Sequence, residues 1–288
     1  MSAPPPKPVS VRELRAMTFT NGDYLIDEGI LNPNSLMFIG GPPKAYKSFI
    51  LASLLYHLVT GTPLFGNYRV NPLSHGMDMA FKVSRPMRVL LLEQEVGFHD
   101  MQQRLQTIYD HLNPYDRAKV DDNFFLHSCD HTLEFNSVGG QQRIQQAISS
   151  CKPDVVAFDP LVEFHTGDEN SAKDMMTVFR NLDFIRERNN VAVIITHHTS
   201  KPSFDGTMTR SGPDLLRGSS TIFAKGDTYF IVTPTARDTG GVMVEVVLRR
   251  GKPILPFRLR VDFHDLRAKF NGWGDQKPED SPGKSTVQ

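Results

Sequence analysis

The sequence predicts an α/β fold: a mostly parallel, twisted sheet with helices on both faces and antiparallel strands added at its C-terminal end. Between residues 36 and 198, short apolar runs alternate with segments of helical spacing, which is typical of parallel strands buried between two layers of helices. Two of these runs end in carboxylates, at the strand ends where parallel sheets gather their ligands. After residue 226 the pattern changes to strands separated by Gly, Pro and Asp turns, which indicates antiparallel additions.

The individual elements follow from hydrophobic periodicity. Helical spacing is found over residues 48–59, 98–112, 141–150 and 171–189. Strand-like runs are found over residues 87–95, 123–127, 154–159 and 191–196, and then over 228–234, 241–249 and 255–263.

We expect one domain with flexible ends. Residues 1–20 are Pro-rich and weakly patterned, which predicts a flexible lead-in. Residues 269–288 are mostly polar with Gly and Pro, which predicts a disordered tail. Residues 21–268 contain no internal repeat and no linker between domains, so we expect them to form a single domain.

The composition is that of a soluble globular protein, with 39% hydrophobic and 22% charged residues. No apolar run is long enough for a membrane span, and prolines stand where a signal peptide has its apolar core. The two cysteines do not make a disulfide framework. We therefore expect a protein of the cytoplasm, or of the nucleoid-equivalent compartment of the host cell. Because 32 basic residues balance 32 acidic ones, any nucleic-acid binding has to come from local patches.

Residues 36–50, LMFIGGPPKAYKSFI, have the pattern of a phosphate-binding loop between a strand and a helix. Loop amides and the helix N-terminus attract phosphate oxygens, Lys47 can reach the β- and γ-phosphates, and the Ser48 hydroxyl can bind Mg²⁺. An ordinary strand–turn–helix junction is the alternative interpretation of the loop alone. The predicted nucleotide-binding residues are Gly41, Pro42, Pro43, Lys44, Ala45, Tyr46, Lys47, Ser48 and Phe49.

Tyr46 departs from this motif, which has glycine directly before the lysine. If the backbone at this position needs a positive φ, a tyrosine costs energy that glycine does not. A loop disabled by Tyr46 would leave a nucleotide-insensitive assembly or regulatory module, which is one alternative for the function.

Carboxylates and histidines follow three of the predicted strands. Glu93 and Glu95 close the run at 87–95, and either could polarise a water that attacks a γ-phosphate. Asp159 closes the run at 154–159 and can hold Mg²⁺ through water. His197 and His198 follow the run at 191–196, where a γ-phosphate sensor would lie. No Cys/His set at zinc spacing accompanies the two histidines, so the sequence does not favour metal ligation by them.

Taken in order, these motifs resemble the RecA-like P-loop ATPases, and within them the AAA-type group that includes the hexameric plasmid replicative helicase RepA. The resemblance covers about residues 30–265. GGPPKAYKS is similar to the family's phosphate loop, VLLLEQE to its strand with the catalytic glutamate, DVVAFDPLVEFHTGDEN to its Mg²⁺-aspartate strand and ITHHTSK to its sensor strand. The resemblance implies that Glu95 and Lys47 are catalytic, that Asp159 and Ser48 hold Mg²⁺, and that His198 is the functional histidine.

Two further segments, DLLRGSS and VVLRRGKP, resemble family segments that supply positive charge. They make Arg217 and Arg250 candidates for the transition-state cation, the second as an arginine finger that reaches into a neighbouring subunit. The resemblance implies a single RecA-like ATPase domain that uses ATP and Mg²⁺. It also implies a homo-oligomeric ring, a hexamer, that translocates on single-stranded DNA as a replicative helicase, with replication proteins as further partners. A DNA repair or recombination ATPase of the same superfamily, without unwinding activity, is the second alternative.

Overall fold

The computed structural model describes residues 10–16, 24–66, 81–128, 132–199, 220–235 and 240–274. The strands within these ranges are β1 (Leu36–Gly41), β2 (Val89–Glu93), β3 (Phe124–Ser128), β4 (Val155–Asp159), β5 (Ala192–His198), β6 (Thr228–Pro234), β7 (Gly241–Leu248), β8 (Phe257–Asp262) and β9 (Arg267–Trp273). The helices are α1 (Val11–Ala16), α2 (Lys47–Thr60), α3 (Phe98–Asp110), α4 (Pro114–Asn123), α5 (Val138–Cys151), α6 (Ala172–Asn189) and α7 (Ser220–Lys225), with short 3₁₀ turns η1 (Asp27–Gly29), η2 (Leu64–Gly66) and η4 (Leu161–Phe164).

All of these strands belong to one sheet in the order β3-β2-β4-β5-β1-β6-β7-β8-β9. The strands from β3 to β6 pair in parallel, and antiparallel pairing begins between β6 and β7 and continues to β9. The predicted α/β class, with antiparallel strands at the C-terminal end, is therefore confirmed.

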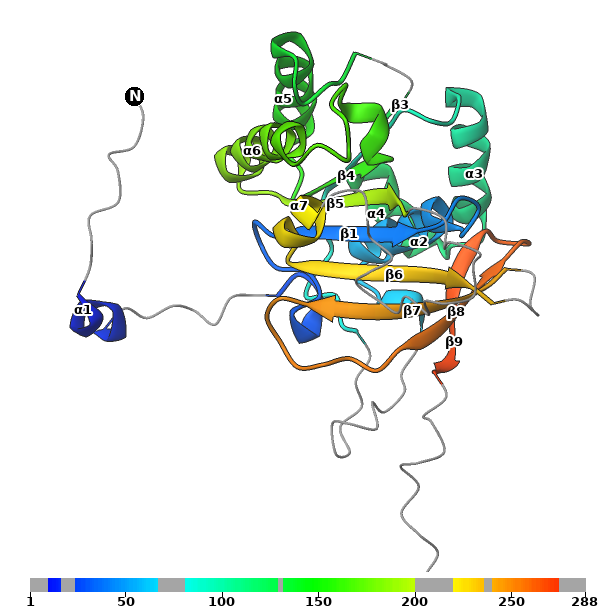
Figure 1. The fold of residues 1–288 in the computed structure, drawn as a ribbon. Helices are drawn as coiled ribbons and strands as arrows, with labels where there is room; N and C mark the ends of the chain where they lie inside the picture. Colours follow the sequence, from blue (N-terminus) through cyan, green and yellow to red (C-terminus); the bar gives the residue numbers. More distant parts are fainter. Residues whose placement is uncertain are drawn as a thin grey trace, which may run out of the picture.

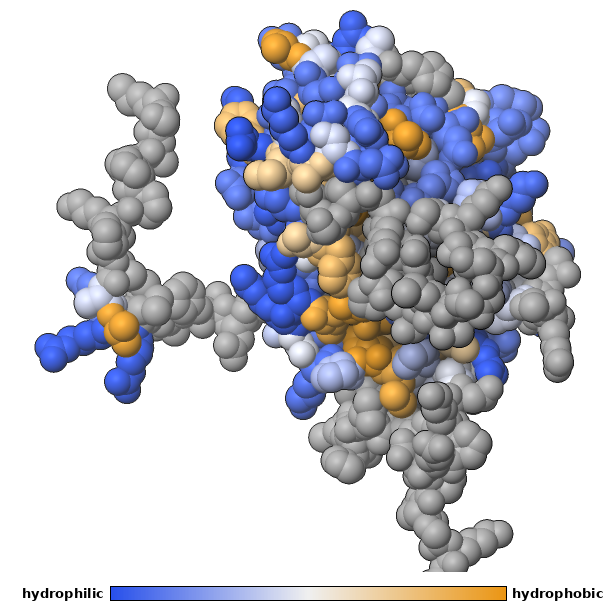
Figure 2. Space-filling model, viewed as in Figure 1, coloured by the Kyte–Doolittle hydropathy of each residue, from blue (hydrophilic) through white to orange (hydrophobic). Residues whose placement is uncertain are grey.

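Helices cover both faces of the parallel part of the sheet (Figure 1). On one face α2, α3 and α4 contribute to an apolar core with the inward side chains of β1, β2, β4 and β5. On the other face α5, α6 and α7 pack on the alternate side chains of the same strands. Both sides of β2 and β4 are buried, which explains why their sequences are almost continuously apolar. The outward side of α5 and α6 is mainly hydrophilic, as an amphipathic helix requires (Figure 2).

Two elements differ from the expectations. Helix α4 was not anticipated, although Asn113 caps it, with its side chain accepting from the Asp116 amide, and Pro114 begins it. Strand β9 carries the sheet through residues 269–273, which the sequence assigned to the disordered tail. Trp273 pairs with Phe257 of β8 beyond a register shift in the β8–β9 ladder, and its ring packs on Phe270 with centroids 5.3 Å apart. The boundary predicted at residue 268 is therefore wrong, because the partly buried rings of Phe270 and Trp273 continue the strand through contacts with Phe257 of β8.

Within the described ranges, no helix is long and apolar enough to cross a membrane. Arg217 and the polar segment that follows β5 lie outside these ranges.

Candidate functional site

The carboxyl ends of β1, β2, β4 and β5 open into a cavity of about 730 Å³. Its walls include five residues that the sequence selected from four separate motifs: Lys47, Ser48, Glu95, Asp159 and His198. Parallel strands bring their carboxyl ends to the same edge of a sheet, which is why motifs so far apart in sequence meet here. The remaining loop residues from Lys44 to Phe49 also line the cavity.

Lys47 is the first residue of α2, and its side chain turns back into the loop. Its Nζ donates to the carbonyl oxygens of Gly41 and Pro42, each at 3.0 Å, and only 6% of the residue is exposed. Burial lowers the pKa of Lys47 to about 8, although the charges of Asp159 and Glu95 act in the opposite direction. Gly41 has to be glycine, because a Cβ there would lie 2.6 Å from the Val232 carbonyl oxygen. Gly41, Pro42 and Pro43 do not line the cavity, and the carbonyl oxygens of the first two position the lysine.

Tyr46 adopts the left-handed conformation that the sequence left in question, with φ 59° and ψ 21°. A non-glycine residue pays about 1 kcal/mol or more for this region. Ring contacts offset that cost, because the centroid of Tyr46 lies 5.8 Å from that of Phe263 and 6.4 Å from that of Phe49. The loop therefore keeps its shape with a tyrosine in place of the usual glycine.

Asp159 ends β4 directly beside the phosphate loop. Its side chain accepts from the hydroxyl groups of Thr196 and Ser48, and the residue is only 4% exposed. Burial raises the pKa of Asp159, whereas the two hydroxyl donors act to lower it. The link between Ser48 and Asp159 joins the two predicted Mg²⁺ ligands across the end of the sheet.

Glu93 and Glu95, left as alternatives by the sequence, have different surroundings. Glu93 is fully buried, and its carboxylate accepts from the backbone amides of Glu95, at 2.7 Å, and Val96, and from Ser128 Oγ at 3.0 Å. Glu93 therefore holds the turn after β2 in place. Glu95 is exposed and lines the cavity, so of the two only Glu95 is available to a bound substrate.

His198 is half-buried at the end of β5 and receives a hydrogen bond from Lys47, with 3.1 Å between Nζ and Nδ1. Burial, followed by the charge of Lys47, lowers the pKa of His198, which favours the neutral ring that can accept this bond. His197 faces the opposite side of the strand. There the Glu169 carboxylate lies 3.6 Å from His197 Nδ1 and 3.7 Å from His165 Nε2. Glu169 thus links the turn after β4 to the end of β5.

The buried His197 makes the stability of the protein depend on pH. Burial lowers its pKa from 6.5 to about 4, although Glu169 acts to raise it. The unfolded chain therefore takes up a proton below pH 6.5 that the folded chain refuses, and stability present at pH 7 is lost as the pH falls toward 4. We expect the free energy of unfolding to fall by about 2 kcal/mol between pH 7 and pH 5 through this group.

Urea unfolding of the wild type and of His197→Asn at pH 7 and pH 5 checks this expectation, because the two proteins share every other ionisable group and the difference between their pH slopes reports on His197. His99→Asn, a change at an exposed histidine of α3, is the matched control. Equal pH slopes in the wild type and in His197→Asn would contradict it.

Two residues of the cavity wall were missed by the sequence analysis. Asp100 and Arg104 line the cavity from α3, and the Arg104 guanidinium lies 4.6 Å from the centroid of the Phe49 ring. Their spacing of four residues places them on one face of a helix that begins just after Glu95. That spacing was the available signal. Arg104 adds a positive charge opposite the phosphate loop.

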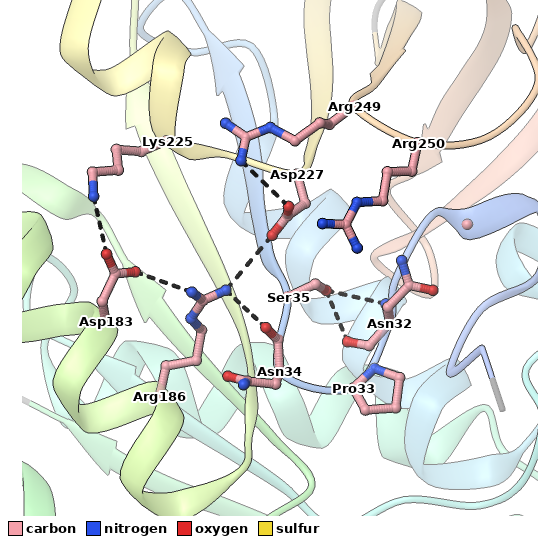
Figure 3. Close-up of a pocket in the computed structure, with 11 residues that line it drawn as sticks. Asn32, Pro33, Asn34, Ser35, Asp183, Arg186, Lys225, Asp227, Arg249 and Arg250 are labelled. Atoms are coloured by element: carbon pink, nitrogen blue, oxygen red, sulfur yellow. Dashed lines mark hydrogen bonds and ion pairs between the residues drawn. The ribbon is translucent and has the colours of Figure 1, made fainter. Parts of the chain in front are cut away.

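The two arginines predicted as transition-state cations are not in this cavity. Arg250 lies at the corner after β7, at the other end of the sheet, where it lines a separate cavity (Figure 3). Arg250 is therefore not among the residues that can contact a nucleotide in the first cavity of the same chain. Arg217 lies outside the described residues.

The residues present fit a nucleoside triphosphate with Mg²⁺. A hydroxyl and a carboxylate from Ser48 and Asp159 are the hard oxygen donors that Mg²⁺ takes from a protein when substrate phosphates and water complete its shell. Within the described ranges, no group of three or more His, Cys, Asp or Glu side chains could hold a metal by itself. The inward-turned Lys47 ammonium supplies the positive charge for the phosphates.

Comparisons with known proteins agree with this geometry. A family model described as AAA domain matches residues 2–203, whereas no curated protein matches the chain. The ATPase domain of G40P has a similar structure, with a TM-score of 0.60 at 12% identity over 90% of this chain and 94% of that one. A DnaB-like replicative helicase, described with its interactions with primase, has a TM-score of 0.60 at 12% identity over 82% of this chain and 57% of that one. The predicted RecA-like P-loop fold is thereby confirmed.

Proposed function

This chain belongs to the AAA domain family, and from that premise we propose that it is an ATP-hydrolysing motor. We propose further that it assembles as a hexamer and translocates on single-stranded DNA as a replicative helicase. The observation that carries the proposal is the shared cavity, in which the loop lysine, two oxygen donors for Mg²⁺, an exposed glutamate and a histidine converge.

Each residue has a role that follows from its position. Lys47 binds the β- and γ-phosphates, and Ser48 and Asp159 hold Mg²⁺. Glu95 orients the attacking water, because it is the exposed carboxylate at the cavity. His198, bonded to Lys47, responds to the γ-phosphate. Mg²⁺, when bound, neutralises negative charge on the phosphates.

The transition state of phosphoryl transfer needs further positive charge. Arg104 supplies it from the same chain, and Arg250 supplies it from a neighbouring subunit as an arginine finger. The position of Arg250 outside its own cavity supports the second role. The likeness to replicative helicase domains supports a ring on DNA and replication proteins as partners.

ATP hydrolysis measured with and without single-stranded DNA tests the motor, and strand displacement on a forked substrate tests the helicase. We expect DNA to stimulate hydrolysis and the fork to open with ATP. Stimulation without displacement would favour the repair or recombination ATPase, and ATP hydrolysis indifferent to DNA would contradict the motor.

A substitution at Tyr46 tests the nucleotide-insensitive alternative. Because Tyr46 already adopts the left-handed conformation, we expect Tyr46→Gly to change the affinity for ATP·Mg²⁺ by no more than about threefold, which corresponds to well under 1 kcal/mol. Fluorescent nucleotide titration measures the affinity. Tyr115→Gly, at an exposed tyrosine of α4, controls for loss of an aromatic ring. If the wild type did not bind nucleotide and the Tyr46→Gly protein did, the result would support the alternative.

A further inference from the structure

A second cavity lies at the opposite end of the sheet from the candidate nucleotide site. It has a volume of about 300 Å³. The turn before β1, the side of α6, the turn before β6 and the corner after β7 form its walls (Figure 3). None of these segments belongs to the phosphate loop or to the motifs that follow β2, β4 and β5.

The cavity wall is held by a network centred on Arg186. Its Nη1 donates to the Asn34 carbonyl oxygen at 2.8 Å, and its Nη2 donates to Asp183 at 3.1 Å. Asp227 lies 3.6 Å from Arg186 Nη1 and accepts from the Leu36 amide at 3.0 Å. Most of the Arg186 side chain is buried, with 15% exposed. The network therefore fixes the position of the guanidinium at the start of β1 before any ligand arrives.

Positive charge exceeds negative charge around this cavity. Four basic side chains line it against two carboxylates, a surplus of two: Arg186, Lys225, Arg249 and Arg250 against Asp183 and Asp227. The carboxylates already pair with three of the cations. A cavity that holds surplus positive charge in addition to its internal ion pairs is suited to bind an anion.

Arg250 supplies the cation that remains. Figure 3 shows its guanidinium pointing into the cavity toward Asp227 and Ser35. Within the described part of the chain it makes no ion pair or hydrogen bond. The buried Nε of Arg186, a donor, also has no hydrogen-bond partner among these residues. Guanidinium groups present planar pairs of N–H donors that match the oxygens of a phosphate.

We propose that this cavity binds a phosphate-type anion between Arg250, Arg249 and Arg186. The cavity is lined mainly by charged and amide side chains, which excludes an apolar ligand and leaves room for more than one phosphate group. The inference does not need the nucleotide site of the same chain to be active, since it uses none of the residues that line that cavity. Arg250 is also the candidate finger, so the test has to separate a free anion from the phosphate of a nucleotide held by a neighbouring copy.

Titration calorimetry with inorganic phosphate, at constant ionic strength and in a Lys47→Ala background, tests the proposal. Removing Lys47 weakens phosphate binding at the loop, so the remaining binding reports on the second cavity. We expect one phosphate per chain to bind in this background. Adding Arg250→Ala is expected to raise its Kd by at least about tenfold, because a charge-assisted hydrogen bond is lost. Adding Arg250→Lys should give an intermediate Kd, since an ammonium lacks the paired donors.

Lys252→Ala is the matched control. It removes the same charge two residues away, from an exposed position that does not line the cavity, and it should change the Kd by less than about twofold. Equal effects of the Arg250 and Lys252 changes would overturn the proposal, because they would indicate only a general field. Loss of all phosphate binding on Lys47→Ala alone would overturn it as well. Unchanged thermal midpoints show that the variants are folded.

Wild-type protein with ATP·Mg²⁺ distinguishes the two sources of phosphate. A free anion gives an Arg250-dependent phosphate affinity that is the same in dilute and concentrated protein. Arg250-dependent ATP binding that strengthens as the protein concentration rises, without Arg250-dependent phosphate binding in dilute protein, would report only the finger already proposed and would overturn the separate anion site. Failure of ATP to bind at all would contradict the proposed function and leave the phosphate measurement on the second cavity intact.

Discussion

Replacing Lys47 with alanine is expected to lower kcat/KM for ATP hydrolysis by at least about 100-fold. The ammonium lies inside a closed loop, 3.0 Å from two carbonyl oxygens and largely shielded from water. A preorganised donor in such a site stabilises the transition state by about 3 kcal/mol, and each 1.36 kcal/mol is about tenfold in rate. Steady-state phosphate release measures the loss.

Lys173→Ala, at an exposed lysine of α6, is the matched control and should keep wild-type activity. The Lys47 variant should remain folded, since burial penalises the charge that it removes. A folded Lys47→Ala protein with more than half of the wild-type rate would contradict both the prediction and the role of the loop.

The second large effect is expected at Glu95. Glu95→Gln should lower kcat by about 100-fold or more, the usual contribution of a positioned general base. It should leave ATP affinity nearly unchanged, because the carboxylate lies in the turn after β2 and the phosphate loop is untouched. Single-turnover hydrolysis, together with nucleotide binding at equilibrium, separates the two quantities.

Glu93→Gln provides the contrast, since it makes the same chemical change two residues earlier. It places an amide where two backbone amides and a hydroxyl donate to the carboxylate, and each unsatisfied donor costs about 1–3 kcal/mol. We expect lower stability in urea as its main effect. A Glu93→Gln protein as stable as the wild type, together with a fully active Glu95→Gln protein, would contradict the roles assigned to the two glutamates.

The sequence predicted the parallel part of the fold well, because β1, β2, β4 and β5 are apolar runs that end at or beside candidate site residues. It also predicted which side chains would meet, since strand ends of one direction share an edge. What it could not predict depended on contacts across the sheet. The division between Glu93 and Glu95 depends on Ser128 of β3 and on where β2 ends, and neither can be read from VLLLEQE.

The sequence analysis did not predict strand β9, for a related reason. Its sequence, RAKFNGW, is stabilised by ring contacts with Phe81 and with Phe257 of β8 rather than by alternation of its own. The loop motif raised the question of whether the backbone at Tyr46 is left-handed. The sequence could not show that the ring of Phe263, more than two hundred residues further along the chain, packs against Tyr46.

The Gly41 carbonyl oxygen accepts hydrogen bonds from two different segments of the chain. Since β5 separates β1 from β4, this oxygen accepts from Lys47 Nζ on one side and from the Thr199 amide, just beyond β5, on the other. We expect a bound phosphate to draw the ammonium away from this oxygen and to leave the Thr199 amide as the remaining donor. We therefore propose that nucleotide binding in the cavity changes the hydrogen bonding of the Gly41 peptide group, which is bonded to the chain just beyond β5.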